Sequence, residues 1–418
     1  MCFFFQNAEF ARPSASRIMR TATIILAVFL LFSRAAEAFT ESPLVGIVSQ
    51  PCMSGVCGPH EGDPPDTSFI AASYSKFVEM AGGRAVPLVY NEDKAELLRR
   101  LRVVNLLLFP GGAASLEAHS PFFQSAKWMF DEAVKMNAAG DRFPIHGTCL
   151  GFELFHVILA NGTAVLDSFD AGDAAAPLIL TAHAAGSRMF QNASSELLAA
   201  AQTRALAMES HVKGVNVSVY RDPALKLSEF FTVLSTSFDV HGKEYVSSVE
   251  SALFPITATQ WHPEKAPFEY NPAQHIAHEP AAILLAQAVA NMLVAEARRN
   301  HHAPASPDDV NNMSIDRESL RFTAASSPFQ QAYILRPATR SRAGGAVPVS
   351  LSQAKHRSLA DEFAGRSHTA RDTGRLGERN RRTQGRTDSQ GADGGGLRTD
   401  AESTGFADRR QTLGQRRA

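Results

Sequence analysis

Short apolar segments alternate with amphipathic segments between residues 44 and 160, and this alternation is the feature that most constrains the fold. Four runs have the length and composition of buried strands: Leu44–Ser49, Arg84–Tyr90, Val103–Phe109 and Phe143–Thr148. The segments that follow them carry apolar residues at helical spacing: Phe69–Ala81 with Ser68 as its N-cap, Ala95–Arg102, Phe122–Ala139 and Leu150–Ala160. This order predicts right-handed βαβ units, and hence an α/β fold with a mostly parallel sheet covered by helices on both faces.

The second half of the chain has a different pattern. Three strand-like segments with few helical residues between them, Phe230–Thr236, Tyr245–Glu250 and Ile256–Gln260, predict an antiparallel extension that leads back to the sheet. A long Ala-rich helix is expected over Ala277–Arg299. We therefore expect one folded domain over residues 39–336.

The composition changes after about Leu335 to Arg, Gly, Ser, Thr, Gln and Asp, with almost no aromatic residues. Such a segment cannot bury enough apolar surface to offset its chain entropy, so a disordered basic tail is expected over residues 337–418. The tail has 16 basic and 9 acidic residues, whereas the whole chain has a net charge of −1. This balance argues against a general nucleic-acid-binding protein. The tail is either a solvated linker, an artefact of the gene model, or a segment for polyanion binding or sorting.

The N-terminus has the pattern of a secretory signal peptide over residues 1–38. The uncharged apolar run Thr21–Phe32 has 12 residues, whereas a transmembrane helix needs about 20. Arg17 and Arg20 precede the run, and the small-residue cleavage pattern Ala36–Ala38 follows it. We expect the mature protein to have no membrane span and to enter the secretory pathway, with the exterior or a lysosome or vacuole as its destination. The alternative is a buried helix of the fold.

Two further features agree with a secretory route. Four Asn-x-Ser/Thr sequons are candidate glycosylation sites: Asn161, Asn192, Asn216 and Asn312. Three cysteines remain after the expected signal peptide. Cys52 and Cys57 lie in one Gly/Pro-rich loop, and a local pair between them would leave Cys149 without a disulfide partner.

The strongest catalytic signal is Gly147–Gly151 (GTCLG), which lies between an expected strand and an expected helix. A G-x-nucleophile-x-G turn at such a junction presents its central side chain at the carboxyl edge of the sheet. The following helix N-terminus favours a thiolate, so we expect it to help lower the pKa of Cys149. The alternative is a buried structural cysteine between two packing glycines.

A thiol nucleophile needs a base and an oxyanion hole. His262 and Glu264 in Gln260–Glu264 can supply an imidazole and the carboxylate that orients it. The Gly-Gly turn after Phe109 leaves backbone amides free, and Gly112 and Leu150 are the candidate donors. A His-Pro turn and an ordinary tight turn are the alternatives. The sequence has neither a phosphate-binding Gly-Lys-Ser/Thr motif nor zinc-ligand spacing, so we expect no metal and no cofactor.

These motifs together resemble the class I glutamine amidotransferase superfamily, and more closely its secreted folate γ-glutamyl hydrolase family (peptidase family C26). The segments that carry the resemblance are Pro110–Gly112, Gly147–Glu153, Gln260–Glu269, Pro43–Ile47, Phe69–Tyr74, Ser187–Asn192, Asn300–His302 and Phe329–Ile334. The resemblance covers residues 42–335. It implies a class I glutamine amidotransferase-like fold and a cysteine omega-peptidase that cleaves γ-glutamyl bonds in folylpoly-γ-glutamates and antifolate polyglutamates. A homodimer is compatible with the family.

The resemblance also implies roles for individual residues. Cys149 matches the family nucleophile, His262 the proton-transferring histidine and Glu264 the third triad member, while Gly112 and Leu150 match the oxyanion-hole amides. The candidates for substrate binding are Glu153, Arg188 and His211, with Arg188 as a carboxylate clamp or an ordinary surface arginine.

Two other functions stay open. Gly186 stands where vertebrate members carry a histidine, and His183 is three residues away. This departure keeps open a catalytically impaired folylpolyglutamate-binding protein. The superfamily resemblance keeps open a glutaminase-type amidotransferase subunit that makes ammonia for a partner.

Overall fold

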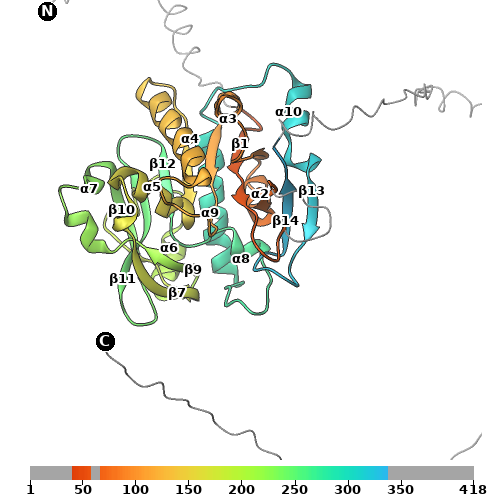
Figure 1. The fold of residues 1–418 in the computed structure, drawn as a ribbon. Helices are drawn as coiled ribbons and strands as arrows, with labels where there is room; N and C mark the ends of the chain where they lie inside the picture. Colours follow the sequence, from red (N-terminus) through yellow and green to blue (C-terminus); the bar gives the residue numbers. More distant parts are fainter. Residues whose placement is uncertain (1–39, 58–65, 338–418) are drawn as a thin grey trace, which may run out of the picture. The chain divides into compact units, whose positions relative to one another are not determined.

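The computed structural model describes residues 40–57 and 66–337, so the expected signal peptide and all but the first residue of the expected tail lie outside the described residues. The central feature is an eight-stranded sheet in the order β4-β1-β5-β6-β12-β11-β10-β8, of which β1, β10, β11 and β12 are labelled in Figure 1. Its strands are β1 Leu44–Val48, β4 Arg84–Leu88, β5 Leu106–Phe109, β6 Ile145–Thr148, β8 Ile179–Leu180, β10 Phe231–Phe238, β11 Glu244–Ser251 and β12 Ile256–Thr259. All pairs from β4 to β12 are parallel, which confirms the expected α/β fold class.

Helices cover both faces of this sheet, as the alternation of apolar segments predicts. The helices are α2 Ala72–Glu79, α3 Lys94–Leu101, α4 Pro121–Ala138, α5 Leu150–Ala160, α6 Ser195–Thr203, α7 Leu227–Phe230, α8 Lys265–Phe268, α9 Pro280–Ala297 and α10 Pro307–Met313. Leu106 and Leu108 of β5 belong to the apolar cluster that contains α2 and α9. Leu107 and Phe109 belong to the cluster that contains α3, α4 and α5, because successive strand residues point to opposite faces.

The expected antiparallel extension is confirmed. Strand β12 pairs antiparallel with β11, β11 with β10, and β10 with β8. The other edge of β12 pairs parallel with β6, which joins the extension to the parallel part of the sheet. A separate antiparallel pair, β7 Asp167–Ala176 and β9 Ala207–Gly214, was not predicted from the sequence.

The expectation of one helix over Phe69–Ala81 is wrong in its first turn. Ser68–Ala71 forms strand β3, and the helix begins at Ala72. The strand belongs to a second sheet in the order β13-β14-β3-β2, whose other strands are β2 Gln50–Pro51, β13 Ser319–Phe322 and β14 Gln331–Leu335. β14 supplies hydrogen-bond partners for β3 from the far end of the domain, and local periodicity carries no signal of such a partner.

The structure also bears on two expectations from the sequence, the absence of a membrane span and the pairing of the cysteines. Among the described residues one helix, α9, is long and apolar enough to cross a membrane, and half of it is buried within the fold. Its apolar residues, such as Leu285 and Val289, pack in the cluster with α2 as a core helix. Cys52 and Cys57 form a disulfide, and Cys149 is a free, buried cysteine.

Candidate active site

Cys149 lies at the sharp turn between β6 and α5, as the GTCLG motif predicts. Its φ of 50° and ψ of −104° are unusual for a residue with a side chain, which marks a strained elbow. The Cys149 N–H donates to the Thr259 carbonyl oxygen at 2.7 Å, so the end of β12 holds the turn in place. A Cβ on Gly151 would overlap the Phe109 carbonyl oxygen, so only glycine lets α5 approach β5 this closely.

His262 and Glu264 follow β12, which pairs in register with β6. The carboxylate Oε1 of Glu264 lies 2.6 Å from His262 Nδ1, and the other ring nitrogen, Nε2, is buried without a partner among the described residues. Burial alone would raise the pKa of Glu264, but the charge and hydrogen bond of His262 outweigh burial and lower it. An ionised Glu264 therefore orients the imidazole and leaves Nε2 available for proton transfer.

The geometry of Gly111 shows that the expected nucleophile and base converge. A Cβ at this position would lie 2.6 Å from His262 Cε1 and 3.2 Å from Cys149 Cβ. It would also lie 2.9 Å from the Tyr74 hydroxyl, so three side chains from distant parts of the chain meet around one glycine.

Tyr74 is a site residue that the sequence did not single out, because it falls at an apolar position of its helix. The Gly111 N–H donates to its hydroxyl oxygen at 2.7 Å, and the hydroxyl lies 3.4 Å from His262 Nδ1. Burial and the Glu264 charge hold the pKa of Tyr74 well above its usual value, so the hydroxyl stays protonated. It links the Gly-Gly turn to the His262–Glu264 pair.

The expectation that α5 gives Cys149 a lowered pKa is wrong for the free protein. Burial, followed by the charge of Glu153, raises the pKa of the thiol well above its usual value. The nearby charge of Lys265 acts in the opposite direction without overcoming burial. The resting nucleophile is therefore a neutral thiol that must lose its proton during the reaction.

Cys149 opens onto a cavity of 380 Å³, which we call the catalytic pocket. Its walls include Gly112 and Leu150, the two predicted oxyanion donors. The Leu150 N–H is in the first turn of α5, where helix amides have no acceptor within the helix. The structure thus brings both expected donors to the same cavity as the thiol.

Glu153 and His211, two of the predicted substrate-binding residues, also line the catalytic pocket. Burial raises the pKa of Glu153 to about 7, and Gln260 Nε2 donates to its Oε1 at 3.2 Å. His211 Nε2 lies 3.1 Å from Glu209 Oε2. Burial would lower the pKa of His211, but the hydrogen bond and charge of Glu209 outweigh burial and raise it. A cationic His211 suits an anionic substrate.

Arg188, the third candidate, is not among the residues that line the catalytic pocket. Its guanidinium Nη1 donates to the Ser251 carbonyl oxygen at 2.9 Å and lies 3.8 Å from Glu250 Oε2, so it is engaged with the end of β11. Gly186 and His183 are exposed and are also absent from the pocket wall. The pocket histidine is His211, from the unpredicted strand β9.

The other candidate sites are dispersed over the surface. Asn161, Asn192 and Asn312 are exposed, whereas Asn216 is half-buried and accepts a hydrogen bond from the Ser218 N–H at 2.9 Å. Within residues 40–57 and 66–337, no group of three or more His, Cys, Asp or Glu side chains is placed to hold a metal ion.

Comparison with known proteins decides the family. The family model of peptidase C26 matches residues 43–264. The chain belongs to the peptidase C26 family. Gamma-glutamyl hydrolase 1 of Arabidopsis thaliana is 37% identical over 294 residues, which is 70% of this chain and 82% of the relative. The human gamma-glutamyl hydrolase is 35% identical over 309 residues, or 74% of this chain and 94% of the relative.

This result confirms the family expected from the sequence motifs. The residues matched by the C26 model contain Gly112, Cys149, Leu150, His262 and Glu264. Among solved structures, a glutamine amidotransferase from Methylobacillus flagellatus is similar at 14% identity and a TM-score of 0.32, over 64% of this chain and 100% of that one.

Proposed function

We propose that this C26 protein is a cysteine-dependent γ-glutamyl hydrolase that acts on folylpoly-γ-glutamates and antifolate polyglutamates. The observation that carries the proposal is the convergence of Cys149 and His262 around Gly111, with Glu264 2.6 Å from the His262 ring, in a family whose relatives are gamma-glutamyl hydrolases. The mechanism requires no cofactor, because the side chains supply the nucleophile and the proton carrier.

The first step is formation of a γ-glutamyl thioester. Cys149 Sγ attacks the γ-carbonyl carbon while its proton passes to His262 Nε2, the ring nitrogen without a partner among the described residues. The Gly112 and Leu150 N–H groups stabilise the tetrahedral oxyanion, and one such donor contributes about 10²–10³ in rate. When the intermediate collapses, the C–N bond breaks and His262 returns the proton to the departing amine.

Hydrolysis of the thioester uses the same groups in reverse. His262 removes a proton from water, the hydroxide attacks the acyl carbon, and the C–S bond breaks to release the γ-carboxylate product. Glu264, ionised and 2.6 Å from Nδ1, stabilises the imidazolium formed in each step. Cys149 regains its proton, which agrees with the raised pKa of the resting thiol.

The charges of the pocket support an anionic substrate. His211, with its raised pKa, and Lys213 both line the catalytic pocket. Each glutamyl residue of the substrate carries a free α-carboxylate, which these cations can bind. Glu153 is an acidic residue of the same pocket, and its pKa of about 7 keeps the carboxyl largely neutral below pH 7.

Turnover of a folate pentaglutamate by the full chain tests the proposal, with products resolved by chain length. We expect shortening of the polyglutamate, and we expect Cys149→Ala to abolish it while still binding the substrate. The first products distinguish endo from exo cleavage. Normal turnover by Cys149→Ala would overturn the nucleophile assignment, and tight binding without turnover by the wild type would indicate a binding protein.

Neither alternative function gains support from the site. The binding-protein alternative rests on Gly186, but Gly186 is exposed and outside the catalytic pocket, where His211 lies instead. The glutaminase alternative requires a synthase partner, whereas the Arabidopsis and human relatives are hydrolases by name.

We also propose that the protein enters the secretory pathway and reaches the exterior or a lysosome or vacuole. The sequence of residues 1–38, the Cys52–Cys57 disulfide and the exposed sequons Asn192 and Asn312 support this proposal. Peptide-N-glycosidase treatment of the protein isolated from its own cells should lower its apparent mass. An unchanged mass, together with an intact N-terminus, would contradict it.

A further inference from the structure

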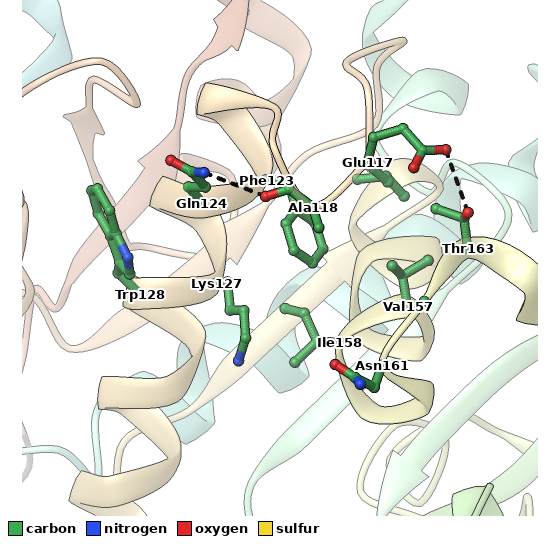
Figure 2. Close-up of a pocket in the computed structure, with 12 residues that line it drawn as sticks. Glu117, Ala118, Phe123, Gln124, Lys127, Trp128, Val157, Ile158, Asn161 and Thr163 are labelled. Carbon is green, nitrogen blue, oxygen red and sulfur yellow. Dashed lines mark hydrogen bonds between the residues drawn. The ribbon is translucent and has the colours of Figure 1, made fainter.

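Three neighbouring cavities share walls and lead away from Cys149. The catalytic pocket shares Ala114, Leu150, Glu153 and Lys213 with a second cavity of 310 Å³, which we call the middle pocket. The middle pocket in turn shares Leu116, Glu117 and Thr163 with a third cavity of 390 Å³, the distal pocket. The three cavities therefore lie in a row, which we call the groove. Thr163 Oγ1 donates to Glu117 Oε1 at 3.4 Å at the boundary between the middle and distal pockets (Figure 2).

The groove follows one face of α5. Leu150 and Glu153 line the catalytic and middle pockets, and Val157 and Asn161 line the distal pocket. Leu150, Glu153 and Val157 are separated by three and four positions, so they lie on the same side of the helix. Asn161 follows as the C-cap of α5. Asn161 is 12 residues beyond Cys149, which places the distal end about 18 Å from the nucleophile at 1.5 Å per residue.

The distal pocket has an apolar interior and a polar rim (Figure 2). Phe123 of α4 and Ile158 of α5 lie between the two helices, and Val157 adds to the apolar lining. Lys127 and Asn161 lie at the same gap from opposite sides. A planar aromatic group with hydrogen-bonding edges suits such a pocket, because its faces bury against apolar side chains while its edges reach polar ones.

The charges along the groove are placed for a substrate with carboxylates near the nucleophile. Lys213 lines both the catalytic and the middle pocket, and Lys127 lines the distal pocket. Lys127 is already paired with Asp131 at 2.8 Å, so the distal pocket has little free positive charge. The acidic residues of the groove are Glu153 in the catalytic and middle pockets and Glu117 in the middle and distal pockets. The catalytic pocket, with Lys213 and the Glu209-paired His211, is therefore the part of the groove richest in basic side chains.

We propose that this groove holds the acyl half of the substrate, with the pterin–aminobenzoyl head group in the distal pocket. The inference rests on the proposed function and adds to it the direction in which the substrate lies. An extended acyl half, from the γ-carbonyl through the glutamyl chain and benzoyl ring to the pterin, is about 15 Å long given bond lengths near 1.4 Å. That length matches the distance along α5.

The test compares two substrates that each have a single γ-glutamyl bond. Pteroyl-γ-diglutamate carries the head group, and N-acetyl-γ-diglutamate lacks it. In the full chain, Ala118→Trp and Gln124→Trp place an indole at the distal pocket from two different segments, and both positions are exposed. The matched control is His119→Trp, an exposed neighbour of Ala118 that does not line the pocket.

We expect each pocket variant to lower kcat/KM for the pteroyl substrate at least tenfold more than for the acetyl substrate. The control should change the two values by the same factor. The deciding quantity is kcat/KM for the pteroyl substrate divided by kcat/KM for the acetyl substrate. If this ratio in both pocket variants stays within twofold of the ratio in His119→Trp, the distal pocket does not bind the head group. A pocket variant that fails to fold loses both activities equally, and the second variant then decides. If the wild type cleaves neither substrate, the proposed function itself fails.

Discussion

Tyr74 joins the oxyanion side of the site to the proton-transfer side through one hydroxyl. The hydroxyl accepts from the Gly111 N–H and lies beside His262 Nδ1 and Glu264. Its hydrogen-bond neighbours are the Gly111 N–H and the His262–Glu264 pair, so we expect its role to be to position these groups.

Tyr74→Phe should lower kcat and leave KM nearly unchanged. The variant leaves a buried Gly111 N–H without its acceptor, which costs about 1–3 kcal/mol, or roughly 5- to 150-fold in rate if the loss falls on the transition state. Steady-state kinetics measure the effect, and Tyr270→Phe, at an exposed tyrosine, is the control. An equal loss in both variants, or a loss confined to KM, would argue against a positioning role.

Glu153 gives the site a pH dependence whose sign follows from its pKa of about 7. Below that pH the buried carboxyl is neutral, and above it a negative charge appears beside Cys149 and repels a polyanionic substrate. We expect kcat/KM for a polyglutamate to fall as the pH rises through 7. Glu153→Gln should remove this part of the fall, because its amide does not ionise. Identical pH profiles for the wild type and the variant would exclude Glu153 as the cause.

The residues that could be predicted are those with a local signal. Cys149, His262 and Glu264 lie in short motifs at strand ends, and the structure brings them together. Tyr74 and Lys213 had no such signal. Packing between distant segments brings Tyr74 to Gly111 and Lys213 to the catalytic pocket.

At the scale of elements, helix α5 begins directly after the nucleophile Cys149 and also lines the proposed groove. Its bounds, Leu150–Ala160, agree with those expected from the sequence. The close approach of α5 to β5 depends on Gly151, whose Cβ position is filled by the Phe109 carbonyl oxygen.

Gly151→Ala should therefore destabilise the fold and displace Cys149. Forcing a methyl group into this contact costs about 1–3 kcal/mol, because the opposing atom belongs to the backbone of a central strand. Urea unfolding measures the loss, and turnover should fall as well. Gly162→Ala is the control, since no atom lies within 4 Å of its Cβ position. Equal unfolding midpoints for the two variants would contradict this account.

At the scale of the whole molecule, strand β14 near the end of the domain pairs with β3 near its beginning. It pairs with β3 from Ala332 to Leu335, and its Ile334 and Leu335 belong to the core cluster with α2 and α9. Glu269, just after the catalytic loop, accepts a hydrogen bond from the Gln330 N–H at 2.5 Å. The last strand thus supports the segment that carries His262.

A chain that ends at residue 330 should be much less stable than one that ends at residue 337. The shorter chain loses the burial of Ile334 and Leu335, which contributes about 1.5–3 kcal/mol for each side chain. Thermal unfolding of both truncated chains beside the full chain measures the difference. We expect the chain that ends at 337 to match the full chain in melting temperature and turnover. A large loss on removing residues 338–418 would show that the tail belongs to the domain.

The sequence by itself determined the α/β class, the bounds of α3, α4 and α5 to within one residue, the nucleophile elbow and the residues of the proposed triad, because each depends on the period or spacing of neighbouring residues. Tertiary structure alone decided that Ser68–Ala71 forms a strand, that Cys149 is a buried neutral thiol, and that Lys213 lines the catalytic pocket while Arg188 and Gly186 do not. It also decided the groove along α5. These features depend on burial and on partners far away in the chain, which residue order does not encode locally.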